Sequence, residues 1–214
     1  RCEEILEAID AIVEINRAEE AIIAIKKGDA KLKEHLNNYI GTYLKIRLVE
    51  VPNFYPMGWE RNLVKYVLKK TYKKYPIEKG IVVNNVATIY AIYEALKTNK
   101  PLIERVVTFT GEGLMNPQNV VVKVGTNVKD VIEYIGGYSE DYINFISGGP
   151  MMGRSLESED LIITSNLNCV LIKKTEEQLM PEECLRCGKC VEVCPAKLSP
   201  VLIKDNKNNI SLLR

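Results

Sequence analysis

Four cysteines in the C-terminal part of the chain constrain this protein more than any other feature. They stand at positions 184, 187, 190 and 194, and Pro195 directly follows the last of them. Two-residue gaps let three thiolates of one tight loop bind a single 4Fe–4S cluster. The fourth thiolate, after a three-residue gap, points away from that cluster and binds another. The spacing therefore predicts 4Fe–4S ligands at Cys184, Cys187, Cys190 and Cys194.

A zinc ribbon and a disulfide framework are the two alternatives for this cysteine run. Zinc sites usually combine two well-separated cysteine pairs or add histidine, and His35, the only histidine, lies far upstream. Thiolates that ligate iron must stay reduced, so the run favours a reducing compartment. Cys2 and Cys169 stand outside the run, and we expect them to be small buried or incidental residues rather than ligands.

Composition excludes several classes of protein. The 29 basic residues nearly balance the 28 acidic ones, which leaves no broad positive field for nucleic acid. No apolar run approaches the length of a membrane span, and the N-terminus lacks a signal-peptide pattern. We therefore expect a chain that is soluble on its own and does not bind nucleic acid.

Helix and strand patterns alternate over residues 1–100. Helices are expected over 2–15 and 28–40, after Gly58 (Leu63 to Leu68), and over 86–100, and strands over 20–27, 44–51 and 80–85. This alternation predicts an α/β fold with a Rossmann-like parallel sheet and crossover helices. Ligands of such sheets bind beyond the carboxyl ends of the strands, where we expect the Gly58 loop and the Asn84–Asn85 pair.

The pattern changes after Pro101. A strand, strand, helix, strand order predicts a separate α+β module over 101–158. Two apolar runs between 159 and 173 are expected to pack back on the earlier modules, ahead of the cysteine run. We therefore expect three domains, over residues 1–100, 101–158 and 159–214. The last of them consists of a connecting segment and the iron–sulfur domain.

Two pairs of polar residues each have two interpretations. Asn84 and Asn85 either cap the following helix or bind ribityl or phosphate oxygens of a cofactor. Arg186 and Lys189 lie inside the cysteine loop. Their charge either favours a reduced cluster and attracts an acidic electron carrier, or they are simply solvated.

Five ordered motifs carry a resemblance to a known family. They are YPMGWERNL (55–63), NNVATIYAIYEAL (84–96), PLIERVVTFTGEG (101–113), SGGPMMG (147–153) and the cysteine run. Together they resemble the C subunit of the Rnf-type ferredoxin:NAD oxidoreductase. The family includes electron-transfer proteins that accompany proline reductase and propanediol-utilisation compartments, and it is similar to the flavoprotein subunit of respiratory complex I.

The resemblance implies a flavin and NADH domain, a soluble-ligand-binding β-grasp domain, and a ferredoxin-like domain with 4Fe–4S clusters. It implies FMN contacts at six positions: Tyr55, Gly58, Glu60, Asn84, Asn85 and Thr88. Glu60 would accept a hydrogen bond from the bound ring system and orient it. Its alternative role is electrostatic stabilisation of the helix that starts after Gly58.

Three departures from the family pattern lead to further expectations. The family's glycine-rich flavin loop and its second cysteine run are both missing from these 214 residues. We therefore expect this chain to be a piece of a longer protein, with partial cofactor sites. Trp59 stands beside Glu60 where the family generally has a small or acidic residue, and its indole would occupy space that flavin or nicotinamide needs.

Three functions follow as hypotheses. The first is an oxidoreductase subunit that passes electrons between NAD(H), FMN and 4Fe–4S centres, toward or from a ferredoxin-like carrier. The second is an adaptor of the same family that has lost NADH binding and feeds a partner reductase such as proline reductase. The third is a non-redox module whose cysteines bind zinc. The resemblance implies a cytoplasmic protein, peripheral on the inner membrane through partner subunits of an electron-transport complex.

Overall fold

The computed structural model describes residues 1–139, 143–158, 160–175, 182–194 and 196–208. The chain divides into two compact units. The first unit combines residues 1–50 with 83–177, and the second combines 51–82 with 178–214.

The N-terminal part of the first unit is a small α/β layer. Its elements are α1 (Cys2–Ile15), β1 (Ala21–Lys26), α2 (Ala30–Ile40), β2 (Ile46–Val51) and α4 (Val86–Thr98), and β1 pairs with β2. Leu6 and Val13 are buried on one side of α1, which packs against α4 and α2. The helical spacing of apolar residues therefore predicted these helices correctly.

The strand expected over 80–85 is wrong. Residues 81–85 form no strand in the structure, and Val82 is 68% exposed. A strand needs a neighbour that accepts and donates its backbone hydrogen bonds, and no described segment supplies one here. The sheet within residues 1–100 consequently has two strands, β1 and β2.

The second unit contains α3 (Glu60–Leu68) and the short 3-10 helix η1 (Pro76–Lys79). Val64 is 3% exposed and supplies the buried side of α3. Further along the chain this unit contains α6 (Lys189–Val193) and α7 (Pro200–Asp205), which follow the first cysteines of the run.

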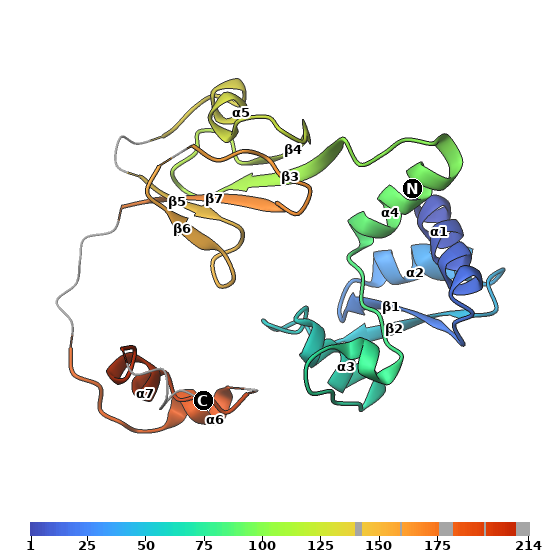
Figure 1. The fold of residues 1–214 in the computed structure, drawn as a ribbon, viewed down its shortest axis with the longest axis horizontal. Helices are drawn as coiled ribbons and strands as arrows, with labels where there is room; N and C mark the ends of the chain where they lie inside the picture. The colour runs from blue at the N-terminus through green and yellow to red at the C-terminus, as the bar shows by residue number, and fades with distance from the viewer. Residues whose placement is uncertain (140–142, 159, 176–181, 195, 209–214) are drawn as a thin grey trace. The chain divides into compact units, whose positions relative to one another are not determined.

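A five-stranded mixed sheet forms the rest of the first unit. It is built from β3 (Glu104–Thr110), β4 (Gln118–Lys123), β5 (Ile143–Ser147), β6 (Arg154–Leu156) and β7 (Cys169–Lys174), in the order β4-β3-β7-β5-β6. β3 runs antiparallel to β4 and parallel to β7, whereas β5 runs antiparallel to both β6 and β7. One face of the sheet is covered by α5 (Val128–Tyr134) (Figure 1).

The core of this module lies between the sheet and α5. Phe109, Ile132, Ile163 and Ile172 are fully buried in it. Ile163 and Ile172 come from the two apolar runs between 159 and 173, and β7 lies in the middle of the sheet. The two runs thus pack on this sheet, as expected, and β7 takes the sheet to Lys174. In the parts of the chain that the structure describes, no helix is long and apolar enough to cross a membrane.

Candidate functional site

The cysteine run forms an exposed loop that leads into α6. Cys184, Cys187 and Cys190 are exposed, Cys194 is half-buried, and all four are free thiols. The backbone turns sharply at Arg186 (φ 52°) and Gly188 (φ 78°), and the amide of Arg186 donates to Cys184 Sγ over 3.4 Å. A bend of this kind lets one short loop present several sulfurs to the same side.

Cys194 lies in a nest of backbone amides. The nearby backbone amides of Leu198 and Ala196, and less strongly that of Lys197, lower the pKa of Cys194. Donors aimed at sulfur favour the thiolate, which is the form that ligates iron. The same amides would tune the potential of a cluster held there.

The fit of this loop to an iron–sulfur cluster rests on its donor set. The loop supplies four unpaired thiols and amide donors to two of them. Its Arg186 forms an exposed ion pair with Asp205 at 3.1 Å. Among the described residues, no three Cys, His, Asp or Glu side chains are already gathered as a metal site. The chemistry of the donors therefore fits a cluster, although no three of these sulfurs are gathered among the described residues.

Three of the predicted flavin contacts lie at the start of α3 in the second unit. Tyr55 is 61% exposed, and a Cβ added to Gly58 would meet no atom within 4 Å. Glu60 is the first residue of α3 and accepts a hydrogen bond of 2.7 Å from the hydroxyl of Tyr72. Burial of Tyr72, together with this carboxylate, raises the pKa of Tyr72.

The other three predicted contacts lie at the start of α4 in the first unit. Asn85 is the N-cap of α4, and its side-chain oxygen accepts from the amide of Ala87 over 2.9 Å. The helix-cap interpretation is therefore observed for Asn85, although its amide group still offers two donors. Asn84 and Thr88 are exposed. The first turn of α4 thus presents polar groups to solvent at a helix N-terminus, which favours anions.

The six predicted flavin positions divide equally between the two units, three in each. Trp59 is the N-cap residue of α3, beside Glu60, and is 41% exposed. Its side chain makes no capping hydrogen bond to the helix.

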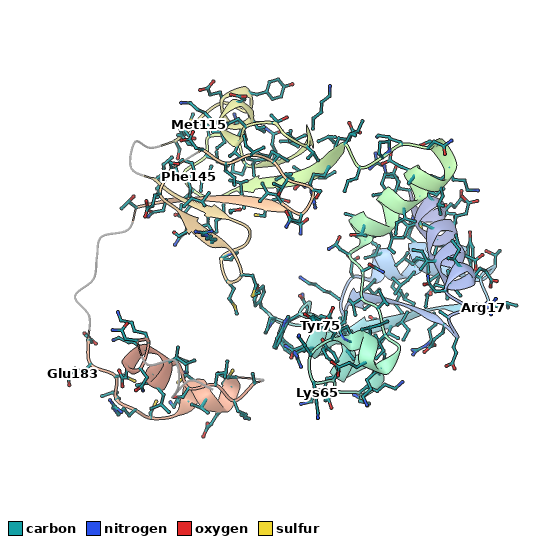
Figure 2. All side chains as sticks on the ribbon, viewed as in Figure 1. Arg17, Lys65, Tyr75, Met115, Phe145 and Glu183 are labelled. Carbon is teal, nitrogen blue, oxygen red and sulfur yellow. The ribbon has the colours of Figure 1, made fainter. Side chains whose placement is uncertain are left out.

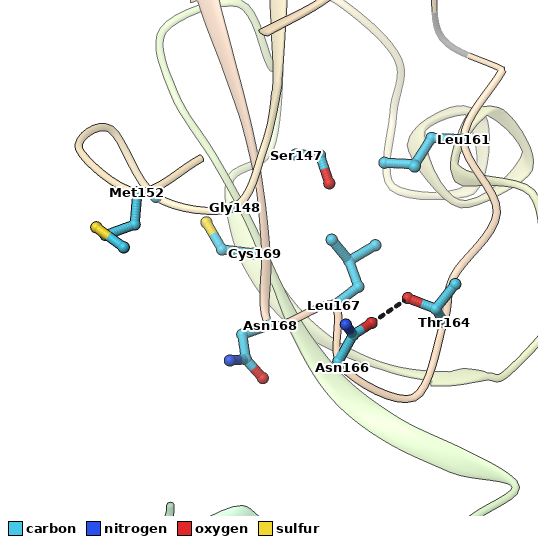
Figure 3. Close-up of a pocket in the computed structure, with 10 residues that line it drawn as sticks. Ser147, Gly148, Met152, Leu161, Thr164, Asn166, Leu167, Asn168 and Cys169 are labelled. Carbon is cyan, nitrogen blue, oxygen red and sulfur yellow. Dashed lines mark hydrogen bonds between the residues drawn. The ribbon is translucent and has the colours of Figure 1, made fainter. Parts of the chain in front are cut away.

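A pocket of about 340 Å³ in the sheet module was missed by the sequence analysis (Figure 3). It lies between the loop that follows β5 and the segment that leads into β7, and Thr164 Oγ1 donates to Asn166 Oδ1 over 2.6 Å in its wall. Burial raises the pKa of Cys169 at its edge. The signal that pointed here was the glycine-rich motif at 147–153, where a Cβ at Gly153 would overlap the carbonyl of Gly149.

Comparison with known families divides the chain into three matched regions. Residues 1–94 match the Nuo51 FMN-binding domain, residues 106–155 match the SLBB domain, and residues 177–197 match a 4Fe-4S binding domain.

Curated relatives and solved structures extend this comparison. The C subunit of the proton-translocating ferredoxin:NAD(+) oxidoreductase complex of Clostridium ljungdahlii is 32% identical over 94% of this chain and 45% of its own length. The C subunit of the ion-translocating oxidoreductase complex of Rhodobacter capsulatus is 33% identical over 94% of this chain and 40% of its own. The Na(+)-translocating counterpart of Acetobacterium woodii is 33% identical over 87% and 43%.

An NAD+-reducing [NiFe]-hydrogenase shares the fold, with a TM-score of 0.61 over 81% of this chain and 36% of that chain, at 15% identity. The chain therefore spans less than half the length of these relatives and of this structure.

Proposed function

This chain is a homologue of the C subunits of Rnf-type ferredoxin:NAD oxidoreductase complexes, and from that premise we propose that it transfers electrons between NAD(H), FMN and 4Fe–4S centres. The observation that carries the proposal is the order of three matched regions, FMN-binding, SLBB and 4Fe-4S-binding, along one chain. The exposed four-thiol loop supports it independently.

The flavin contacts that the resemblance implies are polar groups at the start of α3 and, separately, at the start of α4. The amide of Asn85, the side chain of Asn84 and the hydroxyl of Thr88 offer hydrogen bonds to ribityl or phosphate oxygens at the N-terminus of α4. Tyr72 donates to one carboxylate oxygen of Glu60, and the other oxygen would orient a ring system. When bound, FMN supplies the exchange between two-electron nicotinamide chemistry and one-electron iron–sulfur chemistry.

Cys184, Cys187 and Cys190 would hold one cluster, and Cys194 would serve another. The amides around Cys194 lower the pKa of its thiol, which favours the thiolate form that ligates iron. Lys189 places positive charge in the same loop, which favours the reduced state of a cluster, whereas the charge of Arg186 is partly offset by its ion pair with Asp205.

The partners and location follow from the relatives, which are named as subunits of ion-translocating complexes. We propose that this chain assembles with further subunits of such a complex and exchanges electrons with a ferredoxin-like carrier. Its place would then be the cytoplasmic face of the membrane, reached through those subunits.

The test is reconstitution of the intact protein without oxygen, followed by analysis of iron and acid-labile sulfide and by titration with FMN and then NADH. We expect iron with sulfide, bound flavin, and bleaching of the flavin absorbance by NADH. Bound flavin that NADH does not bleach would instead support the adaptor that has lost NADH binding. Bound zinc without iron or acid-labile sulfide would overturn the proposal of electron transfer.

A further inference from the structure

Basic side chains are concentrated in residues 61–79, between the start of α3 and the end of η1. This segment contains seven lysine and arginine residues and one acidic residue, a formal charge of +6, in a chain whose net charge is +1. The remaining residues together therefore carry −5. The overall balance of charge conceals a strongly positive segment.

The loop that joins α3 to η1 is held from both sides by charged side chains of the same segment. Arg61 donates to the carbonyl oxygens of Tyr72 (2.9 Å) and Lys73 (2.7 Å). Glu78 accepts from the amides of Lys74 and Tyr75, each at 2.9 Å, and from that of Lys73 at 3.2 Å. The one arginine and the one acid of the segment are thus both used to fix its backbone.

The lysines of the segment point outward. Lys65, Lys69, Lys70, Lys73, Lys74 and Lys79 are all exposed. In the described part of the chain none of them forms an ion pair with a carboxylate. Figure 2 labels Lys65 and Tyr75 on this part of the fold. We call these six lysines, with their neighbours Tyr66 and Tyr75, the lysine surface.

Aromatic side chains lie among these charges. Tyr66 is 40% exposed and lies 4.8 Å from the ammonium of Lys69, measured to the ring centroid. Tyr75 is 57% exposed and lies 5.3 Å from the ammonium of Lys74. Such pairs hold the lysine side chains near rigid rings, and exposed tyrosine is enriched at protein interfaces.

We infer that the lysine surface docks a folded partner protein through a carboxylate-rich face. A fixed backbone that presents unpaired positive charge raises the association rate with an acidic partner and sets its orientation, at little ordering cost. This inference needs no cofactor and does not depend on the electron-transfer proposal.

Two other polyanions fit the structure less well. Phosphate recognition favours arginine because its planar fork binds two oxygens together, and the only arginine of this segment is used inside the loop. Membrane-surface helices bury an apolar face in lipid, whereas the apolar side of α3 is turned inward, with Val64 3% exposed. Nucleic acids and anionic lipids are therefore the alternatives that the experiment must separate.

The experiment compares two triple variants of the intact protein that change the net charge equally. K70E/K73E/K74E reverses the lysine surface, and K26E/K27E/K31E reverses three exposed lysines around the end of β1. Circular dichroism checks that both variants fold. The probe is fluorescently labelled poly-L-glutamate, and its binding is followed by fluorescence anisotropy over a range of salt concentrations.

We expect the wild-type protein and K26E/K27E/K31E to bind the probe with the same affinity, which falls as the salt concentration rises. We expect the affinity of K70E/K73E/K74E to be lower by roughly tenfold or more. Zero-length carbodiimide cross-links from the probe should fall on the lysine surface. Absence of wild-type binding, or equal loss in both variants, would overturn the inference. The inference would also be overturned if the protein bound phosphatidylserine vesicles or duplex DNA more tightly than poly-L-glutamate and lost that binding in K70E/K73E/K74E.

Discussion

At the scale of single residues, two of the six proposed flavin contacts already have structural tasks. Glu60 accepts the hydroxyl of Tyr72, and Asn85 caps α4, so their substitution would disturb both fold and ligand. Gly58 differs because a Cβ there would enter open space. It is therefore the position at which cofactor binding can be tested with the least effect on folding.

We predict that Gly58→Ala leaves the unfolding temperature nearly unchanged and weakens FMN binding severalfold, because a methyl group would occupy the space through which flavin approaches the backbone. Gly41→Ala is the matched control, since Gly41 also has open space around it and a helical φ of −56°. Thermal unfolding and flavin fluorescence titration measure the two effects. Equal FMN affinity in the two variants would remove Gly58 from the site.

At the scale of elements, the hydrogen-bond partners of the backbone determine how each segment is held in place. In the sheet module, β3 and β7 are joined although about 60 residues separate them, an arrangement that adds loop-closure cost to folding. The close approach requires Gly111, whose Cβ would overlap the carbonyl of Ile172. In the second unit, the loop before η1 has no ladder partner among the described strands and is held by Arg61 and Glu78 instead.

Gly111 and Gly125 allow backbone strain to be separated from steric overlap. Both have positive φ, 114° and 97°, but only Gly111 lies against another backbone. We expect Gly125→Ala to lower the free energy of unfolding by about 1–2 kcal/mol, and Gly111→Ala to lower it by clearly more. Chemical denaturation measures both, and equal losses would mean that the sheet accommodates the methyl group.

Glu78 makes the order of its loop depend on pH. The amides of Tyr75 and Lys74 lower the pKa of Glu78, so its contribution is complete above the unfolded value of about 4.3 and is lost as pH falls through the lower folded value. We predict that Glu78→Ala lowers the hydrogen-exchange protection factors of residues 73–75 near neutral pH, and that in acid the protection factors of the wild-type protein fall to those of the variant. Glu34→Ala is the control. Unchanged hydrogen-exchange protection in Glu78→Ala would show that the Glu78 carboxylate does not hold this loop.

At the scale of the whole molecule, the proposed flavin contacts and the cysteine loop belong to distant segments of one chain. The flavin positions lie between 55 and 88, and the thiols lie between 184 and 194. The cysteine loop forms its ion pair with Asp205 in α7, not with a flavin position. The two cofactors should therefore be lost separately.

We predict that Cys187→Ser lowers the bound iron of the reconstituted protein by half or more, because a cluster loses one of its ligands, and leaves FMN affinity unchanged. Cys169→Ser, outside the loop and half-buried, should keep full iron content. Iron and sulfide analysis with flavin titration gives both quantities. Simultaneous loss of FMN would mean that the loop supports the flavin site.

The sequence by itself predicted most of the local structure in residues 1–100 and an iron–sulfur function for the cysteine run. The spacing of apolar residues predicted α1, α2, β1 and β2, because helical and strand periods appear directly in the order of residues. The cysteine spacing likewise predicted iron–sulfur ligands, since the reach of a short loop follows from residue count.

Only the tertiary structure decided which segments pair. It placed β7 between β3 and β5 and left residues 81–85 without a strand partner among the described residues. It also assigned Arg61 and Glu78 to holding a loop, so that lysines were left exposed around it. The physical reason is that strand pairing and charge pairing depend on the neighbour across space, and residue order along the chain does not specify that neighbour.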